Sequence, residues 1–297
     1  MSNEDQEREE APHGDLSRRD LVALSVAAGL AVGGAASAAE TSVVEHDVEI
    51  KTPDGTCDAA FIHPATGSHP GVLIWPDAFG LRPALREMGK RLAAQGYAVV
   101  IPNPYYRAGK ADTLGMGTKN FSFQNQDDMA KLRKLMGGLS APGAAEKDAT
   151  AFIAFLDAQK AVNAKKKIGT QGYCMGGPLV FKTAAALPDR VGAAASFHGG
   201  GLVTDQPSSP HLLIPKMKAH LYVAIASNDD MRQPDAKDKL REAFDAAKVP
   251  AEIEVYPSQH GWCMPDMPAP PDKPIYNKAD AERAWSKLLA LYKANLT

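Results

Sequence analysis

From residue 43 onward, short runs of apolar residues alternate with longer segments in which apolar residues recur every three or four positions. The short runs are almost continuously apolar, which is typical of strands that helices cover on both faces of a parallel sheet. The longer segments have the period of amphipathic helices. The predicted core strands are residues 71–75, 97–101, 167–171, 191–196 and 221–226. The predicted helices are residues 82–95, 144–160, 177–187, 234–247 and 278–294.

This alternation predicts an α/β fold in which a doubly wound, mostly parallel sheet is flanked by helices. Residues 43–49 and 58–63 are predicted to form an antiparallel pair, because the turn sequence Pro-Asp-Gly at 53–55 joins them. Residues 105–139 are predicted to form a loop with a short helix, and the proline-rich residues 265–274 are predicted to form a second irregular segment. Both would overhang the carboxyl edge of the sheet, where folds of this class bind ligands.

The first 39 residues differ in character from the rest of the chain. An acidic head leads into Ser17–Leu21 (SRRDL) and then an apolar stretch to about Ala36, a pattern that resembles a twin-arginine export signal. Glycines interrupt the stretch, so no stable membrane span is expected in the mature chain. We therefore predict a signal segment at 1–39, one domain at 40–297, and a periplasmic or exported protein. The alternative is a disordered tail followed by a helix, which would leave the protein cytoplasmic.

Composition narrows the class of partner. A chain of 297 residues with 44% hydrophobic content can form one large core, and its net charge of −2 shows no basic patch for nucleic acid. The eight histidines lack metal-ligand spacing. We expect a small-molecule partner and neither metal nor organic cofactor; the oligomeric state is not predicted. Of three cysteines at least one is unpaired, and a bond between Cys57 and Cys263 stays open.

The sharpest local signal is Gly172–Gly177 (GYCMGG), which lies between a predicted strand and a predicted helix. This is the nucleophile elbow G-x-S-x-G of the α/β-hydrolase fold, with cysteine in place of serine. The glycines suit the elbow because side chains there would collide with the neighbouring strand and helix. The amino terminus of the following helix favours the thiolate form of Cys174. Cys174 is therefore predicted to be the nucleophile; the alternative is a buried structural cysteine.

The elbow requires an acid and a histidine, which follow the nucleophile in that order in this fold. His260 comes after the acid candidates and lies between the last strand and the final helix, so it is the predicted base. Asp229 and Asp230 follow the strand 221–226, and the residues alone leave the choice between them open. His198 ends the strand after the elbow helix and is expected to line the same pocket.

These residues resemble the dienelactone hydrolase family, over about residues 45–294, by the motif G-Y-C-x-G-G, a downstream Asp and a late His-Gly. The resemblance implies Asp230 as the acid, because the family's acid stands four residues before a proline. It also implies an oxyanion hole from the amides of Ala78 and Met175. Asp77 stands where the family often has a thiol-regulating glutamate; its alternative role is to cap the next helix.

The resemblance is weaker around the substrate. Members that cleave dienelactone hold the substrate carboxylate with arginines, one of them shortly after the histidine, where this chain has Trp262 and Met264. Arg107 is the remaining cation expected near the site, or else a solvated loop charge. The other residues expected to line the pocket are Phe79, Tyr105, His198 and Trp262.

The predicted function is hydrolysis of a lactone or carboxylic ester of a small molecule through an acyl-enzyme on Cys174. A thioesterase or peptidase with the same triad is an alternative, because the triad does not determine the leaving group. A non-catalytic periplasmic binding protein on the same fold is another. A redox role is disfavoured by the lack of a C-x-x-C motif.

Overall fold

The computed structural model of the chain describes residues 42–115, 117, 121–139, 141–270 and 272–296. The predicted export signal at 1–39 lies outside these residues and stays a prediction. Within the described ranges, no helix is both long enough and apolar enough to cross a membrane.

The core of the fold is an eight-stranded sheet with the strand order β1-β2-β4-β3-β5-β6-β7-β8. The strands β3 to β8 run parallel, whereas β1 and β2 form an antiparallel hairpin that pairs with β4 at one side. The strands are β1 (Val43–Thr52), β2 (Gly55–Pro64), β3 (Gly71–Trp75), β4 (Ala98–Pro102), β5 (Ile168–Tyr173), β6 (Val191–Phe197), β7 (His220–Ala226) and β8 (Ala251–Tyr256). The predicted doubly wound α/β fold is confirmed.

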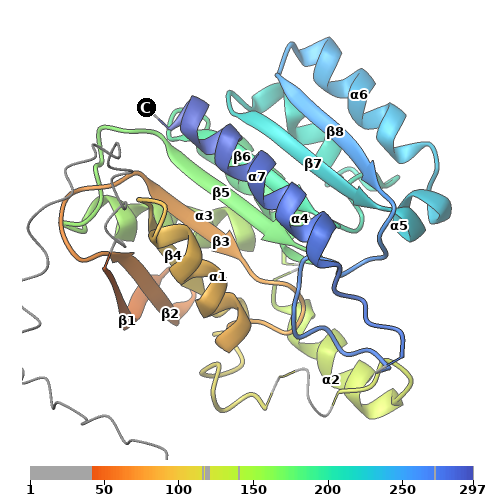
Figure 1. Cartoon of the computed structure of the whole chain (residues 1–297), viewed down its shortest axis with the longest axis horizontal. Helices are drawn as coiled ribbons and strands as arrows, with labels where there is room; N and C mark the ends of the chain where they lie inside the picture. The colour runs from red at the N-terminus through yellow and green to blue at the C-terminus, as the bar shows by residue number, and fades with distance from the viewer. Residues whose placement is uncertain (1–41, 116, 118–120, 140, 271, 297) are drawn as a thin grey trace, which may run out of the picture. The chain divides into compact units, whose positions relative to one another are not determined.

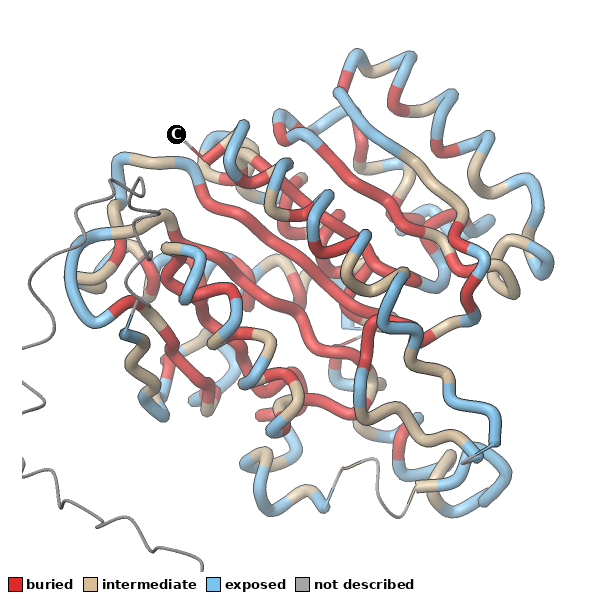
Figure 2. Tube along the Cα trace, viewed as in Figure 1, coloured by how far each residue is buried: buried red, intermediate tan, exposed pale blue. Residues whose placement is uncertain are grey.

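Helices cover both faces of the sheet, as Figure 1 shows. Leucines of α1 (Pro83–Ala93) and α7 (Lys278–Asn295) pack in one apolar cluster with residues of the strands. The other face carries α3 (Ala144–Asp157), α4 (Gly176–Ala186) and α6 (Ala236–Ala247), whose apolar residues form a second cluster. The central strands are consequently buried along their length in Figure 2, which explains their continuously apolar sequences.

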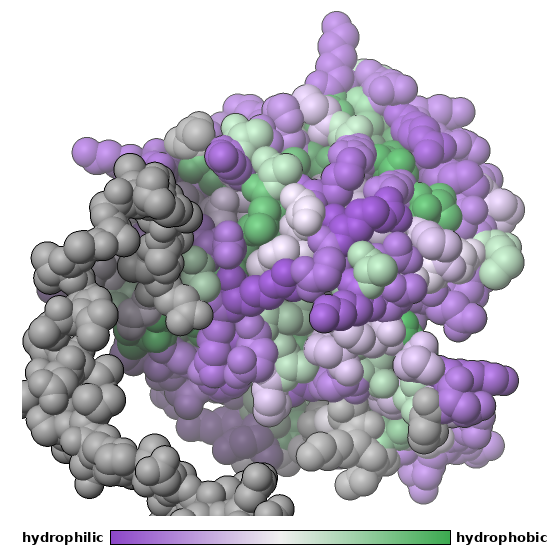
Figure 3. Space-filling model, viewed as in Figure 1, coloured by the Kyte–Doolittle hydropathy of each residue, from purple (hydrophilic) through white to green (hydrophobic). Residues whose placement is uncertain are grey.

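The two irregular segments lie close together at the carboxyl end of the strands. The first contains α2 (Gln126–Gly137), the predicted short helix, which is capped by the side chain of Asn125. Residues 121–124 before it and residues 268–270 of the second segment line one cavity of about 350 Å³. Two further short helices, η1 (Pro210–Lys216) and α5 (Ser227–Arg232), were not predicted. Hydrophilic side chains dominate the face in Figure 3, interrupted by small apolar patches.

Candidate active site

Cys174 occupies a left-handed turn, with φ of 51°, between the end of β5 and the start of α4. Such a conformation is strained for a residue with a side chain and is held only by tight surroundings. A Cβ atom on Gly172 would lie 2.2 Å from the carbonyl oxygen of Gly176, and one on Gly176 would lie 2.5 Å from the carbonyl oxygen of Trp75. Only glycine fits at either position, so both glycines of the predicted elbow are required by close backbone approach.

His260 is hydrogen-bonded to the side chain of Cys174 and is oriented by two residues of α5, the helix that follows β7. Its Nδ1 is 2.6 Å from Oδ2 of Asp229, and its backbone N–H donates to Oδ1 of Asn228 at 2.7 Å. Burial lowers the pKa of His260, but hydrogen bonds to Asp229 and to the side chain of Cys174 outweigh it and raise this pKa to about 10. The arrangement has the geometry of a nucleophile, a base and an orienting acid.

The acid that contacts His260 is Asp229, so the prediction of Asp230 is wrong. Asp230 instead forms an ion pair with Lys237, with 2.7 Å between Oδ1 and Nζ. The two aspartates lie in the short helix α5, where successive side chains point about 100° apart, so only one of them faces the histidine. The chain from β7 enters α5 directly at Ser227, and this places Asp229 on the inner side.

Asp77 is fully enclosed beside the elbow and is bound by a cation that the sequence did not reveal. Both carboxylate oxygens accept hydrogen bonds from Arg82, and Oδ1 also accepts the backbone N–H of Phe79. The same guanidinium holds Asp266 in the irregular segment 265–274. Asp77 does not cap α1, whose N-cap residue is Arg82 itself. The cluster therefore ties the loop that carries Ala78 to a segment almost 190 residues later.

Tyr105 and Phe79 support that loop from two sides. The hydroxyl of Tyr105 donates to the carbonyl oxygen of Ala78 at 2.8 Å and lies 3.3 Å from the sulfur of Met175. Phe79 packs edge-on against Phe121 and Phe123, with centroids 5.0 and 5.9 Å away. The sequence did not predict a role for Phe121 or Phe123, because nothing in an irregular segment indicates which aromatic side chains turn inward.

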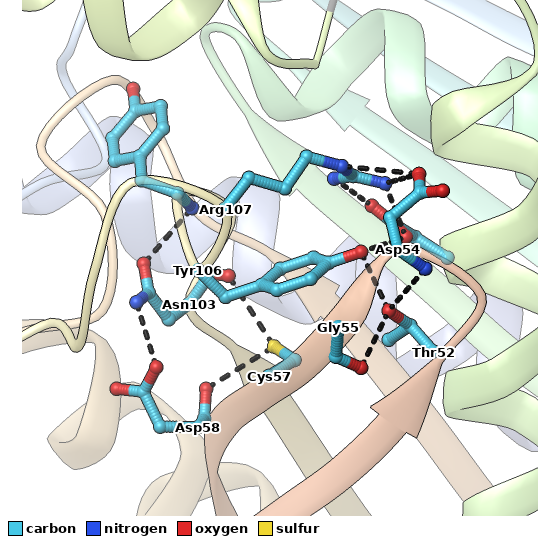
Figure 4. A network of polar contacts seen from close by, with 10 residues as sticks. Thr52, Asp54, Gly55, Cys57, Asp58, Asn103, Tyr106 and Arg107 are labelled. Atoms are coloured by element: carbon cyan, nitrogen blue, oxygen red, sulfur yellow. Dashed lines mark hydrogen bonds and ion pairs between the residues drawn. The ribbon is translucent and has the colours of Figure 1, made fainter.

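Arg107 does not lie in the pocket, so the proposed contact with a substrate carboxylate is wrong. Its guanidinium is 2.6 Å from Oδ2 of Asp54 in the β1–β2 turn and 2.8 Å from Oδ2 of the buried Asp148. Figure 4 shows the side chain turned toward Asp54, alongside the ring of Tyr106. Two carboxylates already use its hydrogen-bonding fork. Arg107 therefore anchors the hairpin to α3.

His198 and Trp262 are fully buried, and the ring of His198 lies between those of His260 and Trp262 in the chain of ring contacts. The His198 ring lies 4.9 Å from that of His260 and 5.1 Å from that of Trp262, which in turn stacks on Tyr256. His198 thus packs directly against His260, and Trp262 packs against His198 in a layer further inside.

The three cysteines are free. Cys57 and Cys263 lie in the apolar clusters on opposite faces of the sheet, so the possible bond between them is absent. Burial raises the pKa of both thiols. In the part of the chain that the structure describes, no group of three or more His, Cys, Asp or Glu side chains could hold a metal ion.

Comparison with known proteins places these features in a family. The sequence profile described as the dienelactone hydrolase family matches residues 57–296. A putative carboxymethylenebutenolidase of Methylorubrum extorquens is 28% identical over 287 residues, covering 92% of this chain and 91% of the relative. One of Escherichia coli K12 is 25% identical over 235 residues, covering 76% and 78%. The crystal structure of a putative dienelactone hydrolase from Klebsiella pneumoniae shares the fold, with a TM-score of 0.69 at 21% identity over 85% of this chain and 99% of that one.

Proposed function

Because the chain belongs to the dienelactone hydrolase family, we propose that it hydrolyses lactones or carboxylic esters of small molecules through a triad of Cys174, His260 and Asp229. The observation that carries this proposal is the placement of His260 between the elbow cysteine and a carboxylate, bonded to both. A structural cysteine requires neither the left-handed turn nor a base with an orienting acid.

In this mechanism His260 is protonated in the resting site, because hydrogen bonds to Asp229 and Cys174 raise its pKa to about 10, and its imidazolium lies beside the sulfur of Cys174. The thiolate attacks the substrate carbonyl carbon, and the electron pair of the C=O bond moves to oxygen. When the tetrahedral intermediate collapses, the C–O bond breaks and His260 donates its proton to the leaving oxygen. Neutral His260 then takes a proton from water, which attacks the thioester and releases the acid.

The oxyanion is bound by the amides of Ala78 and Met175 in this proposal. Met175 directly precedes α4, where the first N–H groups of a helix lack intrahelical acceptors. The peptide after Ala78 is held at both ends, since Tyr105 binds its carbonyl oxygen and Asp77 accepts its N–H. Asp77 thus acts by shaping the loop, and fixed donors of this kind contribute about 10²–10³ in rate.

A panel of lactones, aryl esters, thioesters and peptides, assayed with wild type and Cys174→Ala, tests the proposal and separates its alternatives. We expect the wild type to turn over lactones or aryl esters, and the variant to lose at least ~10³ in kcat/KM. Thioesters or peptides as the better substrates would favour the alternative activities. Full ester hydrolysis by Cys174→Ala would refute the mechanism, and a wild type inert on every substrate would favour a binding protein.

Iodoacetamide at neutral pH gives an independent check on the nucleophile. Burial raises the pKa of Cys57 and Cys263, so both thiols are protonated and inaccessible. Rapid incorporation of one carbamidomethyl group, absent in Cys174→Ala, is the expected result.

A further inference from the structure

His198 makes three connections that no role in the triad accounts for. Its backbone N–H donates to the carbonyl oxygen of Ala224 in β7, the strand that leads to Asp229. Its Nδ1 accepts the backbone N–H of Cys174 at 3.2 Å. Its ring packs edge-to-face against that of His260, with centroids 4.9 Å apart. The ring of His198 thus contacts the backbone of Cys174 and the ring of His260, and the backbone of His198 is hydrogen-bonded to β7, the strand before Asp229.

The protonation of His198 is determined by its surroundings. The ring is fully buried, and burial together with the neighbouring charge of His260 lowers its pKa well below the usual value. Nδ1 accepts a hydrogen bond from the backbone N–H of Cys174, so Nδ1 is unprotonated and the ring proton is on Nε2. Nε2 finds no protein partner among the described residues. Within the described residues, the hydrogen bond that joins this side chain to another residue is therefore the one from Cys174.

The backbone of His198 also departs from an ordinary strand end, since its φ is 40°. Two residues of the site thus have left-handed backbones: Cys174, which follows β5, and His198, which follows β6, the next strand in the chain. The N–H of Cys174 is shared between Nδ1 of His198 and the carbonyl oxygen of Phe197, which lies 3.0 Å away. Strained residues that the surrounding structure maintains are typical of functional sites.

We propose that His198 is a positioning residue of the hydrolase: the Nδ1 atom of its neutral imidazole accepts the backbone N–H of Cys174 and so holds the nucleophile in its left-handed turn beside His260. The proposal rests on the proposed function of Cys174 and His260. It assigns the acceptor at Nδ1, and not the mere volume of the ring, as the feature that matters.

Two substitutions separate acceptor from volume. In His198→Asn, the amide oxygen occupies nearly the position of Nδ1, and Asn tolerates a left-handed backbone. In His198→Gln, the side chain fills more of the space, but its oxygen lies where Nε2 was and cannot reach the amide of Cys174. His198→Gly keeps the left-handed backbone without any acceptor, and it replaces the Gln variant if that protein does not fold.

The experiment measures kcat and KM for an aryl ester, the rate of Cys174 alkylation by iodoacetamide, and the thermal midpoint of each variant. We expect His198→Gln to lower kcat and the alkylation rate about tenfold, the effect of one lost hydrogen bond, with KM within about twofold. His198→Asn should keep both rates within about threefold of wild type.

Equal rates for the Asn and Gln variants, or the faster rates in Gln, would overturn the inference. So would losses that simply follow the thermal midpoints, because those would indicate a structural role. A wild type without esterase activity would refute the proposed function instead. Alkylation needs no substrate, so it would still decide the role of His198 in that case.

Discussion

Replacing Asp229 by Asn, with Asp230→Asn as the matched control, tests which carboxylate orients the base. Asp229 is 13% exposed and its Oδ2 lies 2.6 Å from Nδ1 of His260, a charge-assisted contact. Loss of such a bond removes about 1.5–3 kcal/mol, or roughly 10- to 150-fold in rate. An amide can also turn its NH₂ toward Nδ1 and select the wrong tautomer of His260, which extends the loss to as much as ~10⁴-fold.

Asp230→Asn removes only a partly exposed pair with Lys237, so kcat should stay within about twofold. The assay is steady-state hydrolysis of an aryl ester at pH 7, with the pH dependence of Cys174 alkylation followed alongside. Because Asp229 helps raise the pKa of His260, its replacement should lower that pKa and shift the alkylation profile. A larger loss of kcat in Asp230→Asn than in Asp229→Asn would refute the assignment.

Three further outcomes follow from the geometry. Gly172→Ala should lower the free energy of unfolding by more than ~3 kcal/mol, because the added Cβ would lie 2.2 Å from a backbone oxygen. The control Gly200→Ala, whose Cβ would meet nothing within 4 Å, should change this free energy by less than ~0.5 kcal/mol. Arg107→Met leaves the buried Asp148 without its cation, so the free energy of unfolding in urea should fall by about 3 kcal/mol. KM should stay unchanged, and a raised KM would instead support a contact between Arg107 and the substrate. The pKa of His260 is raised from 6.5 to about 10, so protonated His260 should stabilise the fold relative to His260→Gln. In urea titrations this difference in unfolding free energy should be full below pH 6.5 and be lost by about pH 10. A difference that does not change with pH would contradict the ion pair of protonated His260.

The elements that the sequence predicted well are those whose pattern has one cause. Continuously apolar strands and amphipathic helices follow from burial alone, so β3 to β7 and the main helices were predicted within a few residues. β8 was missed because it is an edge strand with the sequence AEIEVY, whose glutamates face solvent in part and break the apolar run.

The candidate site shows the same division. The sequence predicted that Cys174 and His260 lie together, because motif, strand and helix agree at the elbow and the chain order of the fold points to this histidine. Which aspartate contacts His260 depends on the helical phase within α5, and two adjacent identical side chains do not reveal that phase. The contacts of Arg82 with Asp266 and of Arg107 with Asp148 were not predicted, because these partners lie far along the chain and tertiary packing alone brings them together.

Nucleophilic catalysis by Cys174 can be tested by the intact mass of the protein quenched during turnover of an aryl ester. We expect a mass increase equal to the acyl group, located on Cys174 by peptide mapping and absent in Cys174→Ala. The adduct should accumulate further in His260→Gln if deacylation slows more than acylation. An adduct on another residue, or ester hydrolysis by Cys174→Ala at the wild-type rate, would contradict nucleophilic catalysis by this thiol.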